Sequence, residues 1–80
     1  MENEAQRTLT YGEQAVGLTF NPSGDEDVHK IKALYAQIID LLHERRNSTG
    51  PGEKGRLLSV AITEAQTAQM WAVKGITFKF

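Results

Sequence analysis

The fold of this 80-residue chain is decided by two stretches, DEDVHKIKALYAQIIDLLHERR (Asp25–Arg46) and KGRLLSVAITEAQTAQMWAVKGI (Lys54–Ile76). Both place apolar residues at the three- and four-residue spacing of an amphipathic helix. Between them lies NSTGPG (Asn47–Gly52), whose glycines and proline favour a turn. The sequence therefore predicts an all-α fold built on a long antiparallel helical hairpin.

Both predicted helices carry more apolar surface than one neighbouring helix covers. In the first, three further apolar residues widen the seam beyond the stripe of about 100° that is typical of a surface helix. The seam consists of Val28, Ile31, Tyr35, Ile38 and Leu42, and the widening residues are Leu34, Ile39 and Leu41. In the second, a row of alanines is expected to face the first helix, which leaves the larger side chains for other subunits or for the connector that carries Phe20. The row consists of Ala61, Ala65, Ala68 and Ala72.

A short helix is predicted before the hairpin. Thr10 and Glu13 have the spacing of a capping box, in which the hydroxyl and the carboxylate each accept a backbone N–H at a helix start. We expect the helix over Tyr11–Val16, ended by Gly17.

The remaining boundaries follow from local signals. Ser23 and Glu26 repeat the capping-box spacing and predict the start of the first long helix. Residues 1–9 lack periodicity, so we expect a flexible tail there and one domain over 10–80. Residues 75–80 alternate apolar and polar, which favours an extended end.

Composition limits the classes of protein that fit. A chain of this size has a small core, and without cysteine no disulfide can support it. Oligomerisation is the expected support. Nine basic against ten acidic residues give a net charge of −1, unlike a protein that coats DNA or RNA. The N-terminus does not resemble a signal peptide, and no apolar run approaches the ~18 residues that span a bilayer, so we expect a protein of the cytoplasm without membrane contact.

The chemistry of the chain favours binding over catalysis. His29 and His43 do not belong to a serine-hydrolase or zinc motif, and both are expected on solvated helix positions. We therefore predict no enzyme, no metal site and no cofactor.

Candidate binding residues gather near the start of the hairpin. Lys30 and Lys32 can bind phosphate, and Tyr11 can stack on a base. Two simpler interpretations stay open, in which Lys30 pairs with Asp27 or Glu26 and Tyr11 is a half-buried packing residue. Lys74 either complements a helix dipole or faces a ligand.

Four segments resemble the hairpin domain shared by phage anti-CBASS and anti-Thoeris sponge proteins. Two of them are GLTFNPSGD (Gly17–Asp25) and TAQMWAVK (Thr67–Lys74), and their most specific parts are FNPSGD and MWAVK. They are accompanied by YGE (Tyr11–Glu13) and VHKIK (Val28–Lys32), and the resemblance spans roughly residues 8–78.

The resemblance implies a homo-hexamer of hairpins that sequesters cyclic oligonucleotide immune messengers in the host cytoplasm without cleaving them. It places cyclic dinucleotides between subunits, at Tyr11, the adjacent Gly12 and Lys32. It also implies separate sites for cyclic trinucleotides, where Lys74 is the nearest match, with lysine where arginine is expected.

Two alternatives remain. The anti-Thoeris branch binds cyclic ADP-ribose isomers, but it carries an additional N-terminal region, so the short form favours the anti-CBASS type. The second alternative is a helical adaptor that docks another protein through Trp71 and the segment Phe78–Phe80, without a nucleotide ligand.

Overall fold

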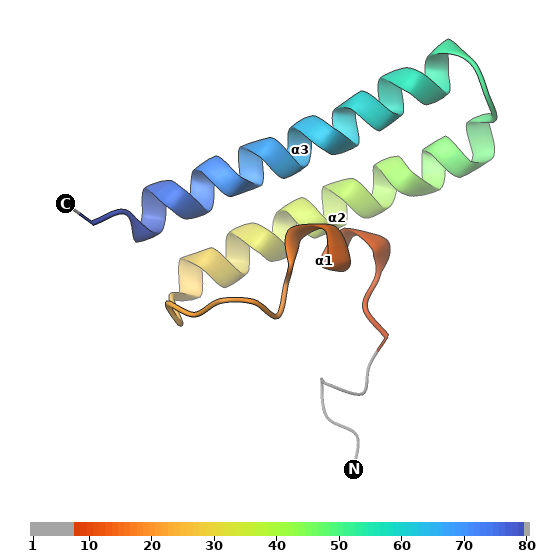
Figure 1. Ribbon diagram of the computed structural model, residues 1–80. Coiled ribbons are helices and arrows are strands. Elements are labelled where there is room, and N and C mark those ends of the chain that lie inside the picture. The colour runs from red at the N-terminus through yellow and green to blue at the C-terminus, as the bar shows by residue number, and fades with distance from the viewer. Residues whose placement is uncertain (1–7, 80) are drawn as a thin grey trace.

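The computed structural model describes residues 8–79, and that part of the chain is helical without a strand. Three helices follow one another: α1 (Tyr11–Val16), α2 (Glu26–Thr49) and α3 (Glu53–Thr77). Helices α2 and α3 run antiparallel side by side, and α1 packs mainly against α2 (Figure 1). The predicted hairpin preceded by a short helix is therefore confirmed. Residues 1–7 of the predicted tail lie outside the described residues.

The ends of α1 follow from the predicted local signals. The Thr10 hydroxyl accepts the Glu13 N–H at 3.1 Å, and a Glu13 carboxylate oxygen accepts the Thr10 N–H at 2.9 Å. At the other end Gly17 adopts a left-handed conformation with φ 64°, which glycine tolerates without steric cost. The chain thus leaves α1 sharply and turns back along α2.

The start of α2 was predicted with the wrong cap. Asp25, not Ser23, caps the helix, because its carboxylate accepts the N–H groups of Asp27 and Val28 at 2.7 and 3.3 Å. The Ser23 hydroxyl instead donates to the Asn21 side-chain oxygen and accepts the Asp25 N–H. The reason is Gly24. Its φ of 69° lies outside the range of a right-handed helix, so the helix can begin only after Gly24.

The turn between the long helices is shorter than predicted. Helix α2 continues through Asn47 to Thr49, and the hydroxyls of Ser48 and Thr49 donate to the Arg45 carbonyl. These bonds to carbonyls of the preceding turn allow polar residues to remain helical. Only the Gly50–Gly52 segment forms the turn.

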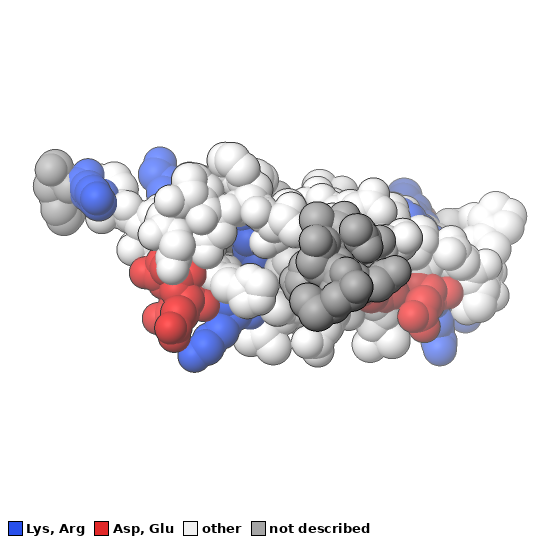
Figure 2. Space-filling view, turned by 90° about the horizontal axis from the view of Figure 1, so that it is seen from below, with Lys and Arg blue, Asp and Glu red and all other residues white. Residues whose placement is uncertain are grey.

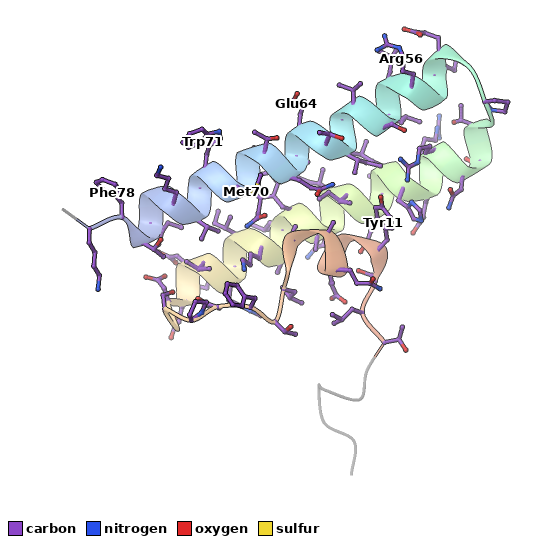
Figure 3. All side chains as sticks on the ribbon, viewed as in Figure 1. Tyr11, Arg56, Glu64, Met70, Trp71 and Phe78 are labelled. Atoms are coloured by element: carbon purple, nitrogen blue, oxygen red, sulfur yellow. The ribbon has the colours of Figure 1, made fainter. Side chains whose placement is uncertain are left out.

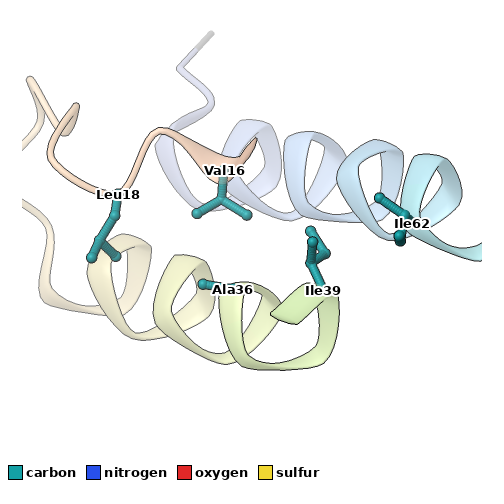
Figure 4. Packing of buried hydrophobic residues seen from close by; sticks show 5 residues of the cluster. All are labelled: Val16, Leu18, Ala36, Ile39 and Ile62. Carbon is teal, nitrogen blue, oxygen red and sulfur yellow. The ribbon is translucent and has the colours of Figure 1, made fainter. Parts of the chain in front are cut away.

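The core lies where α1, α2 and α3 meet. Its buried cluster consists of Val16, Leu18, Ala36, Ile39 and Ile62 (Figure 4). The predicted seam on α2 was partly wrong, because Ile38 is 48% exposed while Ala36 and Ile39 are fully covered. Helix α1 covers the face that carries Ala36, which rotates the buried stripe away from Ile38.

The buried face of α3 also differs from the prediction. Ile62 and Gln69 are the buried residues, whereas Ala68 is exposed and the other alanines of the row are half-buried. The larger side chains do lie outside: Trp71 projects from the edge of α3 that faces away from α2 (Figure 3). The prediction of a large uncovered apolar surface on α3 is thus supported.

The C-terminal end is more helical than predicted. Helix α3 includes Gly75 and continues to Thr77, whose hydroxyl donates to the Val73 carbonyl at 2.8 Å. Phe78 then adopts an extended backbone. Phe80 lies outside the described residues. No helix in the described part of the chain is long and apolar enough to cross a membrane.

Candidate functional site

Gly12 brings α1 against α2. Its N–H donates to the Asp40 carboxylate at 2.7 Å, and a Cβ built on Gly12 would lie 2.1 Å from the Ala36 carbonyl oxygen. No residue other than glycine fits at this distance. Gly12 therefore fixes where its neighbour Tyr11 stands.

Tyr11 lies in a stack at the start of α1. Its ring is parallel to the His43 ring at a centroid distance of 3.9 Å, and the Arg46 guanidinium lies 5.8 Å from the Tyr11 centroid. Arg46 also links the helices, since it donates to the Ser59 hydroxyl on α3 at 3.0 Å. Tyr11 itself is 41% exposed. It stands at the rim of a shallow hollow with Gln14 and Gln66.

His43 was predicted on a solvated position, and this was wrong. It is partly buried, whereas His29 is exposed as predicted. An Arg46 nitrogen lies 3.1 Å from His43 Nδ1. Because arginine carries only donors, Nδ1 is the acceptor in this contact. The proximity of Tyr11 and His43 required the docking of α1 and has no signal in the sequence.

Lys32 is the most unusual side chain of the site. It is 5% exposed, and its ammonium donates to the carbonyls of Gly17 (3.0 Å) and Phe20. The Phe20 ring lies 5.6 Å from the same nitrogen. Burial lowers the pKa of Lys32 below its ordinary value of 10.5. No carboxylate among residues 8–79 forms an ion pair with this ammonium.

Lys32 stands in the wall of a groove of about 290 Å³ between the connector, the start of α2 and the end of α3. The connector contributes Phe20 and Pro22, and α3 contributes Gln69 and Val73. An ammonium has three N–H donors and no acceptor. Two of those donors bind carbonyls, so a third remains for a group in the groove.

Gln69 was missed by the sequence reasoning. It is 5% exposed and lines the same groove as Lys32. A signal for it exists, because Gln69 lies seven residues after the buried Ile62 and thus on the same helix face. A polar residue at that position predicts either a buried polar contact or a ligand.

Lys74 lies at a different surface. Its ammonium is 5.5 Å from the Trp71 centroid, and the two side chains border a hollow of about 360 Å³ with Met70 and Thr67. Lys30 is exposed, and the ion pair with Asp27 that remained open is not formed in the described chain.

The predicted site residues therefore do not converge within one protomer. Tyr11 stacks on His43, whereas Lys32 precedes His43 in α2 by about three turns, roughly 16 Å at the helical rise. Tyr11 and Gly12 form one group, and Lys32 belongs to the groove. Lys74 forms a third group.

The surface offers binding chemistry. In the view of Figure 2, acidic side chains gather in two small groups and basic side chains are scattered, so that face has no continuous basic surface. Within residues 8–79, no three His, Cys, Asp or Glu side chains are placed to hold a metal ion. Aromatic rings, separate cations and one buried amide are the recognition groups that the described chain presents.

Residues 12–77 match the family model of the Acb2/Tad1 hairpin domain. No curated protein and no solved structure matches the chain. The family is known for binding cyclic nucleotide messengers, as a sponge-type binding domain. The resemblance carried by the connector and by MWAVK is thereby confirmed, and the chain belongs to the Acb2/Tad1 hairpin domain family.

Proposed function

We propose that this protein sequesters cyclic oligonucleotide immune messengers, cyclic dinucleotides first, and blocks anti-phage CBASS signalling by lowering their free concentration without cleaving them. Family membership supports the class of ligand. The observation that carries the proposal is Lys32, a buried ammonium without a carboxylate partner in the described chain, at the wall of a groove. A buried charge of this kind is costly, and an anionic ligand would compensate it.

In this proposal Lys32 neutralises a phosphate and Tyr11 stacks on a base. Gly12 contributes by seating α1, so that Tyr11 is held in place before the ligand arrives. Because Lys32 lies about 16 Å along α2 from His43, on which Tyr11 stacks, one cyclic dinucleotide would reach Tyr11 of one protomer and Lys32 of another. Lys74 would serve a second site for cyclic trinucleotides.

Self-association is part of the proposal, with a hexamer as the expected assembly. In the described part of the chain, six apolar residues are buried and eleven large apolar side chains are exposed. An excess of this size is unusual for a lone small domain. Two stripes carry much of it. One consists of Leu34, Ile38 and Leu41 on α2, and the other of Leu57, Val60 and Trp71 on α3, with Phe78 just after the helix.

Replacing Trp71 with alanine should weaken self-association at least tenfold, because an exposed tryptophan is a frequent anchor of interfaces. Trp71 is 66% exposed, so the protomer itself should fold normally. Sedimentation equilibrium measures the dissociation constant. Glu64→Ala on the same edge of α3 (Figure 3) is the matched control. Equal assembly of Trp71→Ala and Glu64→Ala would contradict this assignment and would favour a docking role for Trp71 toward another protein.

A calorimetric titration tests the proposed function directly. Cyclic dinucleotides, cyclic trinucleotides and cyclic ADP-ribose isomers are titrated separately into the wild-type protein. We expect nanomolar binding of at least one cyclic dinucleotide, equivalent to about −12 kcal/mol. The complex is then denatured, and the nucleotide should be recovered intact. Absence of binding across the panel would contradict the proposal, and a cleaved product would contradict sequestration.

Binding should weaken as the pH rises through the lowered pKa of Lys32 toward 10.5. The free protein loses the Lys32 proton in this range, whereas a bound phosphate favours the charged ammonium, so binding takes up protons there. Calorimetry in buffers of different ionisation enthalpy measures that uptake. Lys32→Arg stays charged throughout. If Lys32→Arg binds with the same proton uptake, Lys32 is not the group responsible.

A further inference from the structure

Gln69 is only 5% exposed, yet its side-chain amide has no hydrogen-bond partner among the described residues. No fully buried side-chain nitrogen or oxygen in that part of the chain lacks a partner. The amide atoms of Gln69 must therefore keep contact with the groove that Gln69 lines. Because these atoms face the groove and have no protein partner, a ligand there can take both of their hydrogen bonds in place of water.

The other walls of the groove limit what can occupy it. Phe20, Met70 and Val73 offer flat or apolar surface, and Lys32 offers one ammonium donor. The volume of about 290 Å³ lies at the lower end of small-molecule pockets. One nucleobase with an adjoining phosphate oxygen fits these walls, whereas a whole cyclic dinucleotide exceeds them.

The amide of Gln69 presents a donor beside an acceptor. On the N7 edge of a purine, adenine matches this pair with its N6 amino group and N7, which glutamine binds through two hydrogen bonds, whereas guanine presents two acceptors, O6 and N7. The amide also stands on α3, across the groove from the connector that carries Phe20. A ring between Phe20 and Val73 would thus have its polar edge toward Gln69.

We propose that Gln69 is a specificity-determining residue, which selects adenine in the groove while Lys32 binds the adjoining phosphate. This inference rests on the proposed function and adds to it the identity of the recognised base. The roles proposed above for Tyr11 and Lys74 do not involve Gln69, so this role in ligand binding is additional to them.

The test uses the cyclic dinucleotide of adenosine and an analogue in which purine without the amino group replaces adenine. Both are titrated by calorimetry into the wild-type protein and Gln69→Met. The methionine keeps the length of the side chain and removes both hydrogen bonds. We expect Gln69→Met to bind the adenosine ligand roughly 5- to 100-fold more weakly, the range of one bidentate pair. Its melting temperature should equal or exceed that of the wild type, because an unpartnered amide is lost.

The analogue separates base recognition from general damage. Wild-type protein should lose affinity for the analogue, whereas Gln69→Met should bind both ligands equally, so the two losses are not additive. Gln37→Met, an exposed position on α2, is the control and should bind as the wild type does.

Four results would overturn the inference. Equal affinity of the wild type and Gln69→Met for the adenosine ligand would remove Gln69 from recognition. Additive losses would show that Gln69 does not contact the amino group. Tight binding of a guanosine ligand together with no binding of the adenosine ligand would contradict adenine selection and leave the proposed function intact. If no messenger of the panel binds the wild type, the proposed function fails and this inference fails with it.

Discussion

Replacing Gly12 with alanine should lower the free energy of unfolding by about 2–4 kcal/mol. The added Cβ would lie 2.1 Å from the Ala36 carbonyl oxygen and 2.9 Å from the Asp40 carboxylate, so α1 must move away from α2. That movement also breaks the 2.7 Å bond between the Gly12 N–H and Asp40. The loss would consume much of the ~3–5 kcal/mol that one core of this size supplies.

Urea denaturation followed by circular dichroism measures the effect. Gly75→Ala is the matched control, because it is also a helical glycine but has no heavy atom within 4 Å of the added Cβ. Alanine at position 75 should stabilise the protein by up to about 1 kcal/mol, the difference in helix propensity. Equal stability of Gly12→Ala and the wild type would show that α1 does not pack on α2 as described.

Replacing Lys32 with methionine should weaken messenger binding about 100-fold, because the variant removes a buried donor from a charged phosphate contact. The fold should survive. The carbonyls of Gly17 and Phe20 lose a donor, but the cost of burying an ammonium disappears as well, and methionine fills similar volume. Calorimetry gives the affinity, and a thermal melt by circular dichroism checks the fold.

Lys30→Met is the control for Lys32→Met. Both lysines stand near the start of α2, but Lys30 is exposed and Lys32 buried. A general electrostatic attraction would make the two variants lose affinity alike, by a small factor that salt reduces. A folded Lys32→Met protein with wild-type affinity would remove Lys32 from the site and leave its two carbonyl bonds as its role.

Local signals predicted the fold well where they act over a few residues. The capping box at Thr10, the left-handed Gly17 and the helical periodicity on both sides of the turn all correspond to the structure. The errors arose where distant contacts decide the outcome. Ile38 has the right spacing for a buried seam, but α1 covers Ala36 instead, and this depends on the close approach at Gly12.

The candidate site was less predictable than the fold. The chemistry of the residues offered Tyr11, Lys30 and Lys32 as candidates with a packing role for Tyr11 left open, and the family resemblance then selected Tyr11 and Lys32. Spacing also gave no sign that Lys32 is buried beneath the connector or that His43 stacks on Tyr11. Gln69 could have been found, because its polar side chain interrupts the apolar face that begins at Ile62.

Sedimentation velocity with detection at the absorbance of the nucleotide tests the central claim most directly. The protein is mixed at low micromolar concentration with the cyclic dinucleotide that binds best in the titrations. We predict that the nucleotide sediments in a fixed ratio with a particle several times larger than the 8.9 kDa chain, and that denaturation releases it intact. A well-folded 8.9 kDa particle that sediments without nucleotide would contradict the account.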